Sequence, residues 1–183
     1  VIEKTCEIQQ IPAPTFAETK RSEYLFNEFT RLGLKDVSQD ETGNVYASWP
    51  GSGEGCLVVS AHLDTVHSGD TPLALKRSRE RITGPGVGDN SLGVATLLGI
   101  GRYLADTRAD LGGRIWLVGD VCEEGLGNLA GMQAVVQRFG EQAVAYLILE
   151  GLGLGQICHR GLGVLRYRVT VETTGGHPWS NYG

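Results

Sequence analysis

The sequence lacks three features that define large classes of protein: a long apolar run, a basic stripe and closely spaced cysteines. No apolar run approaches the roughly 18–20 residues of a membrane span, and we expect no signal peptide in the first segment. The pI is near 5.4 and lysine and arginine form no stripe, which argues against nucleic acid as a partner. These absences predict a protein that binds neither membranes nor nucleic acids.

Cysteine is present, but not in a pattern that builds a framework. The four cysteines lie far apart, and three of them are in or beside apolar runs: Cys6, Cys56, Cys122 and Cys158. This spacing fits neither a disulfide scaffold nor a zinc finger, and predicts reduced, mostly buried thiols in a cytoplasmic protein.

Glycine is the residue in excess. The chain has 27 glycines in 183 residues, about twice the usual ~7%. They follow no Gly-X-Y period, so they predict many tight turns between strands and helices. The length allows one sizeable core. Because the sequence starts at Val1 and stops at Gly183 without a closing helix, we expect residues to be missing at one or both ends.

Apolar runs alternate with helical patterns along most of the chain. Apolar residues recur at helical spacing in 14–33, 90–105 and 129–139, and continuous apolar runs that predict buried strands cover 56–61, 115–118 and 145–149. Shorter extended pieces are expected at 37–39 and 44–49. This order predicts an α/β fold, a three-layer αβα sandwich. Residues 164–171 instead alternate apolar and polar side chains, which predicts a half-exposed antiparallel strand beyond a domain boundary near Gly161.

Acidic and imidazole side chains follow each of the three buried strands. The first strand leads into His62 and Asp64, the second into Asp120 and then Glu123-Glu124, and the third into Glu150. Asp89 stands at the start of a helix, after a glycine-rich turn. Because the carboxyl ends of such strands border one crevice, we expect these groups to converge.

One imidazole and four or five carboxylates cannot share a crevice without positive charge, because like charges and burial both disfavour ionisation. One or two divalent metal ions would resolve this repulsion. Imidazole and carboxylate ligands without thiolate favour Zn²⁺, with Co²⁺ or Mn²⁺ as possible substitutes. Alternation along the strand puts His62 and Asp64 on one side, so Asp64 can orient His62. In the Glu123-Glu124 pair, one acid can bind metal while the other acts as a base, as metal-assisted hydrolysis requires.

Two other sequence features have a simpler interpretation than a functional site. Gly86-X-Gly88 could cradle phosphate, but the following Asp89 is unsuitable for an anion. Cys122 could be a nucleophile, but no neighbouring cation in the sequence would lower its pKa, so a packed thiol is favoured.

Five motifs together resemble the cocatalytic di-zinc amidohydrolases, the family of glutamate carboxypeptidase, acetylornithine deacetylase, succinyl-diaminopimelate desuccinylase, aminoacylase and peptidase T. They are Ser60-Ala61-His62-Leu63-Asp64-Thr65-Val66, Gly86-Val87-Gly88-Asp89-Asn90, Glu123-Glu124-Gly125, Glu150 and Gly175-Gly176-His177. The resemblance covers roughly residues 10–183 and is nearest to the peptidase T-like members.

The resemblance implies a role for each matching residue. His62 and Glu150 would hold one zinc ion, Asp89 would bridge two ions, and Glu124 would hold the second. Asp64 would orient His62, and Glu123 would be the general base. His177 would stabilise the developing oxyanion in the active site of a partner subunit. These seven residues are the candidate site.

The same resemblance implies the domain organisation and the substrate class. Residues 1–160 would form an incomplete zinc-exopeptidase domain, and residues 161–183 would begin an α+β lid and dimerisation domain of a homodimer. The final ligand, a late histidine, has no counterpart after His177. The expected activity is hydrolysis of a small peptide or an N-acyl amino acid. The alternative is an inactive protein of the same fold that binds metal or partners.

Overall fold

A computed structural model describes residues 1–151, 153, 155–177 and 179–180. The chain divides into two units, Val1–Gly153 and Leu154–Gly183. Among the described residues, the first unit contains all the helices and strands.

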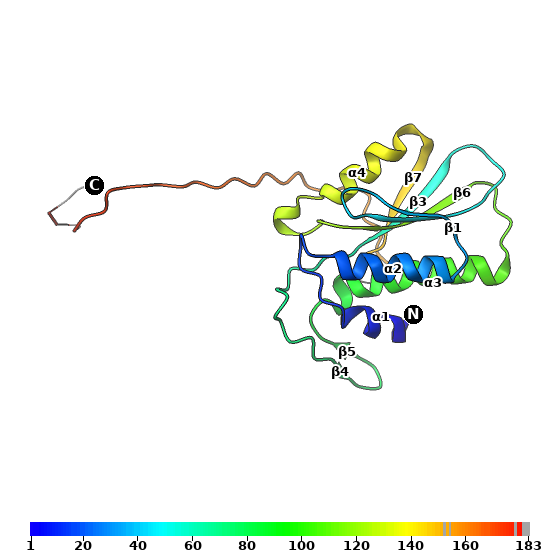
Figure 1. Ribbon diagram of the computed structural model, residues 1–183, viewed down its shortest axis with the longest axis horizontal. Coiled ribbons are helices and arrows are strands. Elements are labelled where there is room, and N and C mark those ends of the chain that lie inside the picture. The colour runs from blue at the N-terminus through cyan, green and yellow to red at the C-terminus, as the bar shows by residue number, and fades with distance from the viewer. Residues whose placement is uncertain (152, 154, 178, 181–183) are drawn as a thin grey trace. The chain divides into compact units, whose positions relative to one another are not determined.

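A five-stranded mixed sheet lies at the centre of the first unit (Figure 1). In spatial order its strands are β1 (Lys35–Gln39), β2 (Val45–Trp49), β6 (Arg114–Asp120), β3 (Cys56–His62) and β7 (Ala143–Ile148). The strand β3 runs parallel to both β6 and β7, and β2 pairs antiparallel with β1 and β6. The three apolar runs of the sequence therefore form adjacent parallel strands, whose carboxyl ends meet at one edge.

Helices cover both faces of this sheet (Figure 1). One face packs on α2 (Thr19–Arg31) and α3 (Gly93–Thr107), and the other packs on α4 (Ala130–Phe139). The helix α1 (Ile2–Gln9) packs on α3, farther from the sheet (Figure 1). Neighbouring residues of β3 enter different cores, because side chains alternate along a strand. Val59 packs with the α1, α2 and α3 residues, whereas Val58 packs with Val135 and Phe139 of α4. This arrangement confirms the predicted three-layer α/β architecture.

Short elements connect the main ones. A two-stranded sheet of β4 (Lys76–Arg77) and β5 (Ile82–Thr83) precedes the helical turn η1 (Val87–Leu92), which leads into α3. The backbone of η1 is not helical at Asp89 and Asn90, and the peptide bond between these two residues is cis. Two further turns, η2 (Gly125–Gly127) and η3 (Gly140–Gln142), flank α4.

The structure differs from the sequence prediction in several elements. The run at 145–149, predicted as a buried strand, forms the edge strand β7 of the described sheet, where Leu147 and Ile148 are 48% and 45% exposed. The helix predicted at 90–105 begins only at Gly93, and the helix α1 has no counterpart in the prediction.

The predicted helix at 14–33 begins only at Thr19, because Phe16 has a left-handed backbone with φ of 74°. No strand forms at 164–171, where the chain is extended and exposed. A strand needs a hydrogen-bonded neighbour, and within the described residues this segment pairs with none. The predicted domain boundary at 160–161 and the lid remain predictions. No helix in the described part of the chain is long and apolar enough to cross a membrane.

Candidate metal centre

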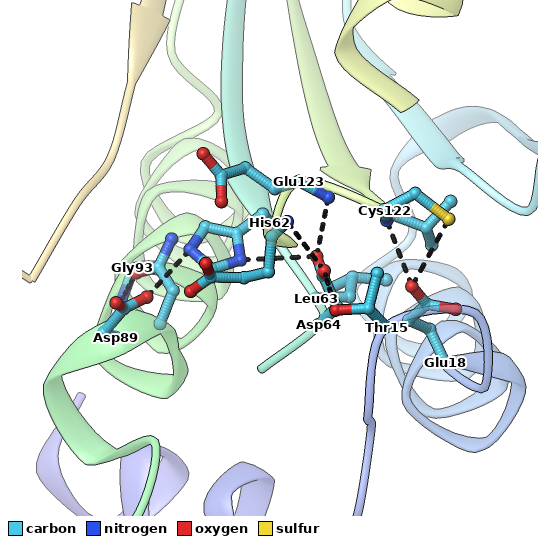
Figure 2. Close-up of polar contacts among 12 residues, drawn as sticks. Thr15, Glu18, His62, Leu63, Asp64, Asp89, Gly93, Cys122 and Glu123 are labelled. Atoms are coloured by element: carbon cyan, nitrogen blue, oxygen red, sulfur yellow. Dashed lines mark hydrogen bonds and ion pairs between the residues drawn. The ribbon is translucent and has the colours of Figure 1, made fainter. Parts of the chain in front are cut away.

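His62 is the focus of the acidic cluster at the carboxyl end of the sheet (Figure 2). It is the last residue of β3 and is 2% exposed. Its Nε2 atom lies 2.9 Å from Asp89 Oδ1 and 3.4 Å from Glu150 Oε1. The strand ends and the η1 turn therefore bring these three residues together, as the sequence predicted.

Glu124 belongs to the same cluster. His62, Asp89 and Glu124 each offer one ligand atom, and these atoms lie within 4.8 Å of one another. Ligand atoms around a tetrahedral zinc ion are roughly 3.3 Å apart, given bond lengths of about 2.0–2.2 Å. The four residues predicted as metal ligands thus lie close enough to share one or two ions, and an imidazole with several carboxylates is a suitable donor set.

Asn90 links the turn that carries Asp89 to the loop that carries Glu150. Its side chain is fully buried, donates to the Leu149 carbonyl at 2.9 Å and accepts from the Gly93 N–H at 3.0 Å. The backbones of the two loops also approach closely, because a Cβ atom at Gly151 would overlap the Gly88 carbonyl group. Part of the glycine excess therefore permits this close approach.

Asp64 is fully buried and holds the backbone of the Glu123-Glu124 pair (Figure 2). Its Oδ1 accepts from the Glu123 N–H at 3.0 Å, and its Oδ2 accepts from the Glu124 N–H and the Thr15 hydroxyl, both at 2.9 Å. His62 Nδ1 is 3.4 Å away, an ionic contact that is longer than a well-formed hydrogen bond. Burial raises the pKa of Asp64, but the contact with His62 and the backbone N–H donors outweigh it, so the net pKa is lowered.

The cluster is short of positive charge. Burial lowers the pKa of His62, but the carboxylates of Asp64, Glu150 and Glu123 raise it to about 9 overall. Burial, and then repulsion from Asp89 and Glu123, raise the pKa of both Glu124 and Glu150. In the part of the chain that the structure describes, the ion pairs of these carboxylates are with His62 alone. The carboxylates around His62 therefore favour a positive charge at the position of its imidazole.

A buried arginine near the cluster was missed by the sequence analysis. Arg21 of α2 is 2% exposed, and its guanidinium donates to the carbonyls of Leu63 and Ile11, each at 2.8 Å. Burial lowers its pKa to about 10, against the opposing attraction of Asp64. Arg21 therefore places a buried positive charge near Asp64 that the sequence pattern did not predict. Helical periodicity alone assigns such an arginine to a solvated face.

Asp120 and Cys122 lie outside the ligand cluster. Asp120 is buried beside His62 in the β3–β6 register, and burial raises its pKa to about 6. Cys122 is a buried thiol, and burial raises its pKa to about 11, as expected for a packed cysteine. His177 belongs to the second unit, and its role stays a prediction.

Comparison with protein families gives one match. The model of peptidase family M28 matches residues 44–157, a range that contains His62, Asp64, Asp89, Glu123, Glu124 and Glu150. A search of curated proteins found no match.

Solved structures share the fold of this chain at low sequence identity. Aminopeptidase PepT from Bacillus cereus is 24% identical with a TM-score of 0.68, over 81% of this chain and 42% of its own. A Staphylococcus aureus tripeptidase is 22% identical with a TM-score of 0.66, over 81% of this chain and 42% of its own. A third structure is that of the Bacillus subtilis YXEP protein, a dinuclear metal-binding peptidase from the M20 family. It is 16% identical with a TM-score of 0.62, over 80% of this chain and 41% of its own. The chain thus spans about two fifths of the length of these proteins, and the likeness confirms the zinc-exopeptidase type of fold.

Proposed function

The chain belongs to peptidase family M28, and on that premise we propose that it is a zinc-dependent hydrolase that cleaves an amide bond in a small peptide or an N-acyl amino acid. The observation that carries the proposal is the convergence of His62, Asp89 and Glu124, whose ligand atoms lie within 4.8 Å of one another. The side chain of Glu123 lies beside this cluster (Figure 2).

Four side chains would hold the metal. We assign His62 and Glu150 to one zinc ion, Glu124 to a second, and Asp89 to both. Zinc in such a site polarises the amide carbonyl and lowers the pKa of water. The crowding of carboxylates around His62, with its effect on their pKa values, supports a site that is completed by divalent cations.

Glu123 would serve as the general base. Its N–H is held by Asp64, and its side chain extends away from Asp64 toward the His62 side of the cluster (Figure 2). A carboxylate there can accept a proton from the attacking water and pass it to the departing amine nitrogen. Asp64 would orient both His62 and this base.

We extend the proposal to the second unit. His177 would stabilise the oxyanion that develops on the substrate carbonyl, acting in the active site of the partner subunit of a homodimer. Residues 161–183 would begin the lid that carries this histidine.

The direct test measures hydrolysis of tripeptides and N-acetyl amino acids by the full chain with added Zn²⁺, Co²⁺ or Mn²⁺. Glu123→Gln should keep the metal content and lower turnover by about 100- to 10,000-fold, because the base is lost. Glu141→Gln, at an exposed acid in η3, is the matched control and should retain activity. Near-normal turnover in Glu123→Gln would refute the assignment. Metal binding without hydrolysis of any substrate would favour the inactive alternative.

A second test counts metal ions. His62→Ala should lose one equivalent of metal by elemental analysis, because His62 is the central ligand of one ion. An unchanged stoichiometry would contradict the role assigned to His62.

A further inference from the structure

Two buried carboxylates hold the turn that follows β6. Three consecutive backbone N–H groups, those of Cys122, Glu123 and Glu124, point at acidic side chains. Asp64 accepts the second and third. Glu18 accepts the first, with Oε1 lying 3.0 Å from the Cys122 nitrogen. The proposed base is therefore held through its own N–H and through that of the preceding residue.

Glu18 reaches this turn from the start of α2, 104 residues away in sequence. It is 6% exposed, and the same Oε1 atom also accepts from the Phe16 N–H at 3.0 Å and from the Cys122 thiol at 3.5 Å. Figure 2 shows Glu18 below Cys122, on the side of Asp64 away from Asp89. Glu18 thus lies outside the metal-ligand cluster.

The turn needs such support because its backbone is unusual. Cys122 has a left-handed conformation with φ of 54°, whereas Glu124 is extended. A residue other than glycine keeps a left-handed conformation only where its surroundings fix it. The change of direction between Cys122 and Glu124 lets two adjacent glutamates serve different roles. On the carbonyl side, the Ala130 N–H donates to Cys122 and the Leu129 N–H donates to Glu123.

We propose that Glu18 is a positioning residue for Glu123, acting through the backbone of Cys122. The inference rests on the proposed role of Glu123 as general base. Glu18 fixes the N–H of the left-handed residue, and this fixes the direction in which the following side chain leaves the turn. Asp64 also fixes the turn, but it holds Glu124 as well as Glu123 and lies against His62. Glu18 therefore controls the base without taking part in metal binding.

The chemistry of the acceptor distinguishes two variants, Glu18→Gln and Glu18→Leu. A glutamine keeps an oxygen that can accept from the Cys122 N–H, although a neutral acceptor binds more weakly than a carboxylate. A leucine fills similar space with no acceptor. Glu23→Leu, at an exposed glutamate of the same helix, is the matched control.

Hydrogen exchange measures the turn independently of catalysis. In Glu18→Leu, the amides of residues 122–124 should exchange at least 10-fold faster than in the unaltered chain, while those of α3 keep their rate. In Glu18→Gln the increase should be smaller, and in Glu23→Leu it should be absent. Unchanged exchange at 122–124 in Glu18→Leu would overturn the proposal. If the leucine variant does not fold, unchanged exchange in Glu18→Gln overturns it instead.

Steady-state kinetics then distinguish a loss of positioning of Glu123 from a general loss of structure or of metal. Glu18→Leu should lower kcat by 10- to 100-fold, leave KM within about threefold and keep the metal content, and Glu18→Gln should recover most of kcat. A loss of metal that parallels the loss of kcat would overturn the proposal, because it would place the effect at the ligands. If the unaltered chain shows no hydrolysis, the proposed function fails, whereas faster exchange would still show that Glu18 holds the turn.

Discussion

The two halves of the candidate metal centre are built in different ways. The inner half comprises His62, Asp64 and the Glu123-Glu124 turn, and the outer half comprises Asp89 and Glu150. His62 and Asp64 are 2% and 0% exposed, whereas the side chains of Asp89 and Glu150 are 66% and 33% exposed. The inner half is held by hydrogen bonds to the buried carboxylate of Asp64, and the outer half consists of carboxylates on loops.

Because of this difference, we expect the inner half to contribute mainly to folding and the outer half mainly to metal binding. Residues of the inner half lie at or next to the ends of the paired strands β3 and β6, so sheet formation itself brings them together. The outer carboxylates are brought to His62 by the Asn90 link between two loops, and they repel one another there. We therefore expect inner substitutions to lower the stability of the metal-free protein and outer substitutions to lower mainly its affinity for metal.

Asp64→Ala should have the largest effect on stability. It removes the acceptor of two backbone N–H groups and of the Thr15 hydroxyl, and leaves these partly buried donors unpaired. We expect the free energy of unfolding to fall by about 3–5 kcal/mol, measured by urea denaturation in the presence of a chelator. The control Asp70→Ala alters an exposed residue. A loss below about 1 kcal/mol in Asp64→Ala would mean that the inner half is not held as described.

Arg21→Met should cause the second-largest loss of stability. The variant keeps much of the apolar stem but loses the hydrogen bonds to the Leu63 and Ile11 carbonyls, and it leaves Asp64 without its neighbouring cation. The expected loss in unfolding free energy is about 2–4 kcal/mol.

The matched control for this variant is Arg31→Met on the same helix. Arg31 pairs with Glu28 at 2.7 Å on the surface, and an exposed pair contributes at most about 1 kcal/mol. Equal losses in the two variants would show that burial of Arg21 adds nothing to stability.

The sequence predicted the layers and the ligand cluster because both follow from local patterns. Continuous apolar runs indicate strands buried on both faces, and in β3 Val58 and Val59 do pack on opposite sides of the sheet. The same rule fails for β7, because a strand at the edge of the described sheet leaves Leu147 and Ile148 partly exposed. His62, Asp89, Glu124 and Glu150 could be grouped because polar residues that follow parallel strands share one edge. The structure brings these four side chains together.

The supporting residues could not be predicted in the same way. Arg21 and Glu18 lie in or beside an amphipathic helix, where charged residues are normally assigned to solvent. Their burial depends on partners far away in sequence: the Leu63 carbonyl for Arg21 and the Cys122 N–H for Glu18. The strand predicted at 164–171 was wrong for a related reason, because alternation indicates a tendency to extend and supplies no partner strand.

Asn90→Asp tests the link between the halves and should have a smaller effect. The amide that donates to the Leu149 carbonyl becomes a carboxylate oxygen facing that carbonyl, while the acceptor for the Gly93 N–H is kept. We expect a loss of about 1–2 kcal/mol in unfolding free energy and weaker zinc binding, measured by denaturation and metal titration. Asn27→Asp, at an exposed position of α2, is the control. Unchanged metal affinity would show that the link does not place Asp89.

Asp89→Asn should change the stability of the metal-free protein least. It therefore gives the clearest test of the difference between the inner and outer halves. The variant weakens the contact with His62 at 2.9 Å but also removes a charge that repels Glu124 and Glu150. Because these effects oppose each other at an exposed side chain, the metal-free unfolding free energy should stay within about 0.5 kcal/mol. Zinc affinity should fall by more than the roughly 10- to 100-fold that follows loss of a residue supporting a ligand. A stability loss as large as that of Asp64→Ala would erase the distinction between the halves, because the fold would then depend on the same carboxylate that the metal needs.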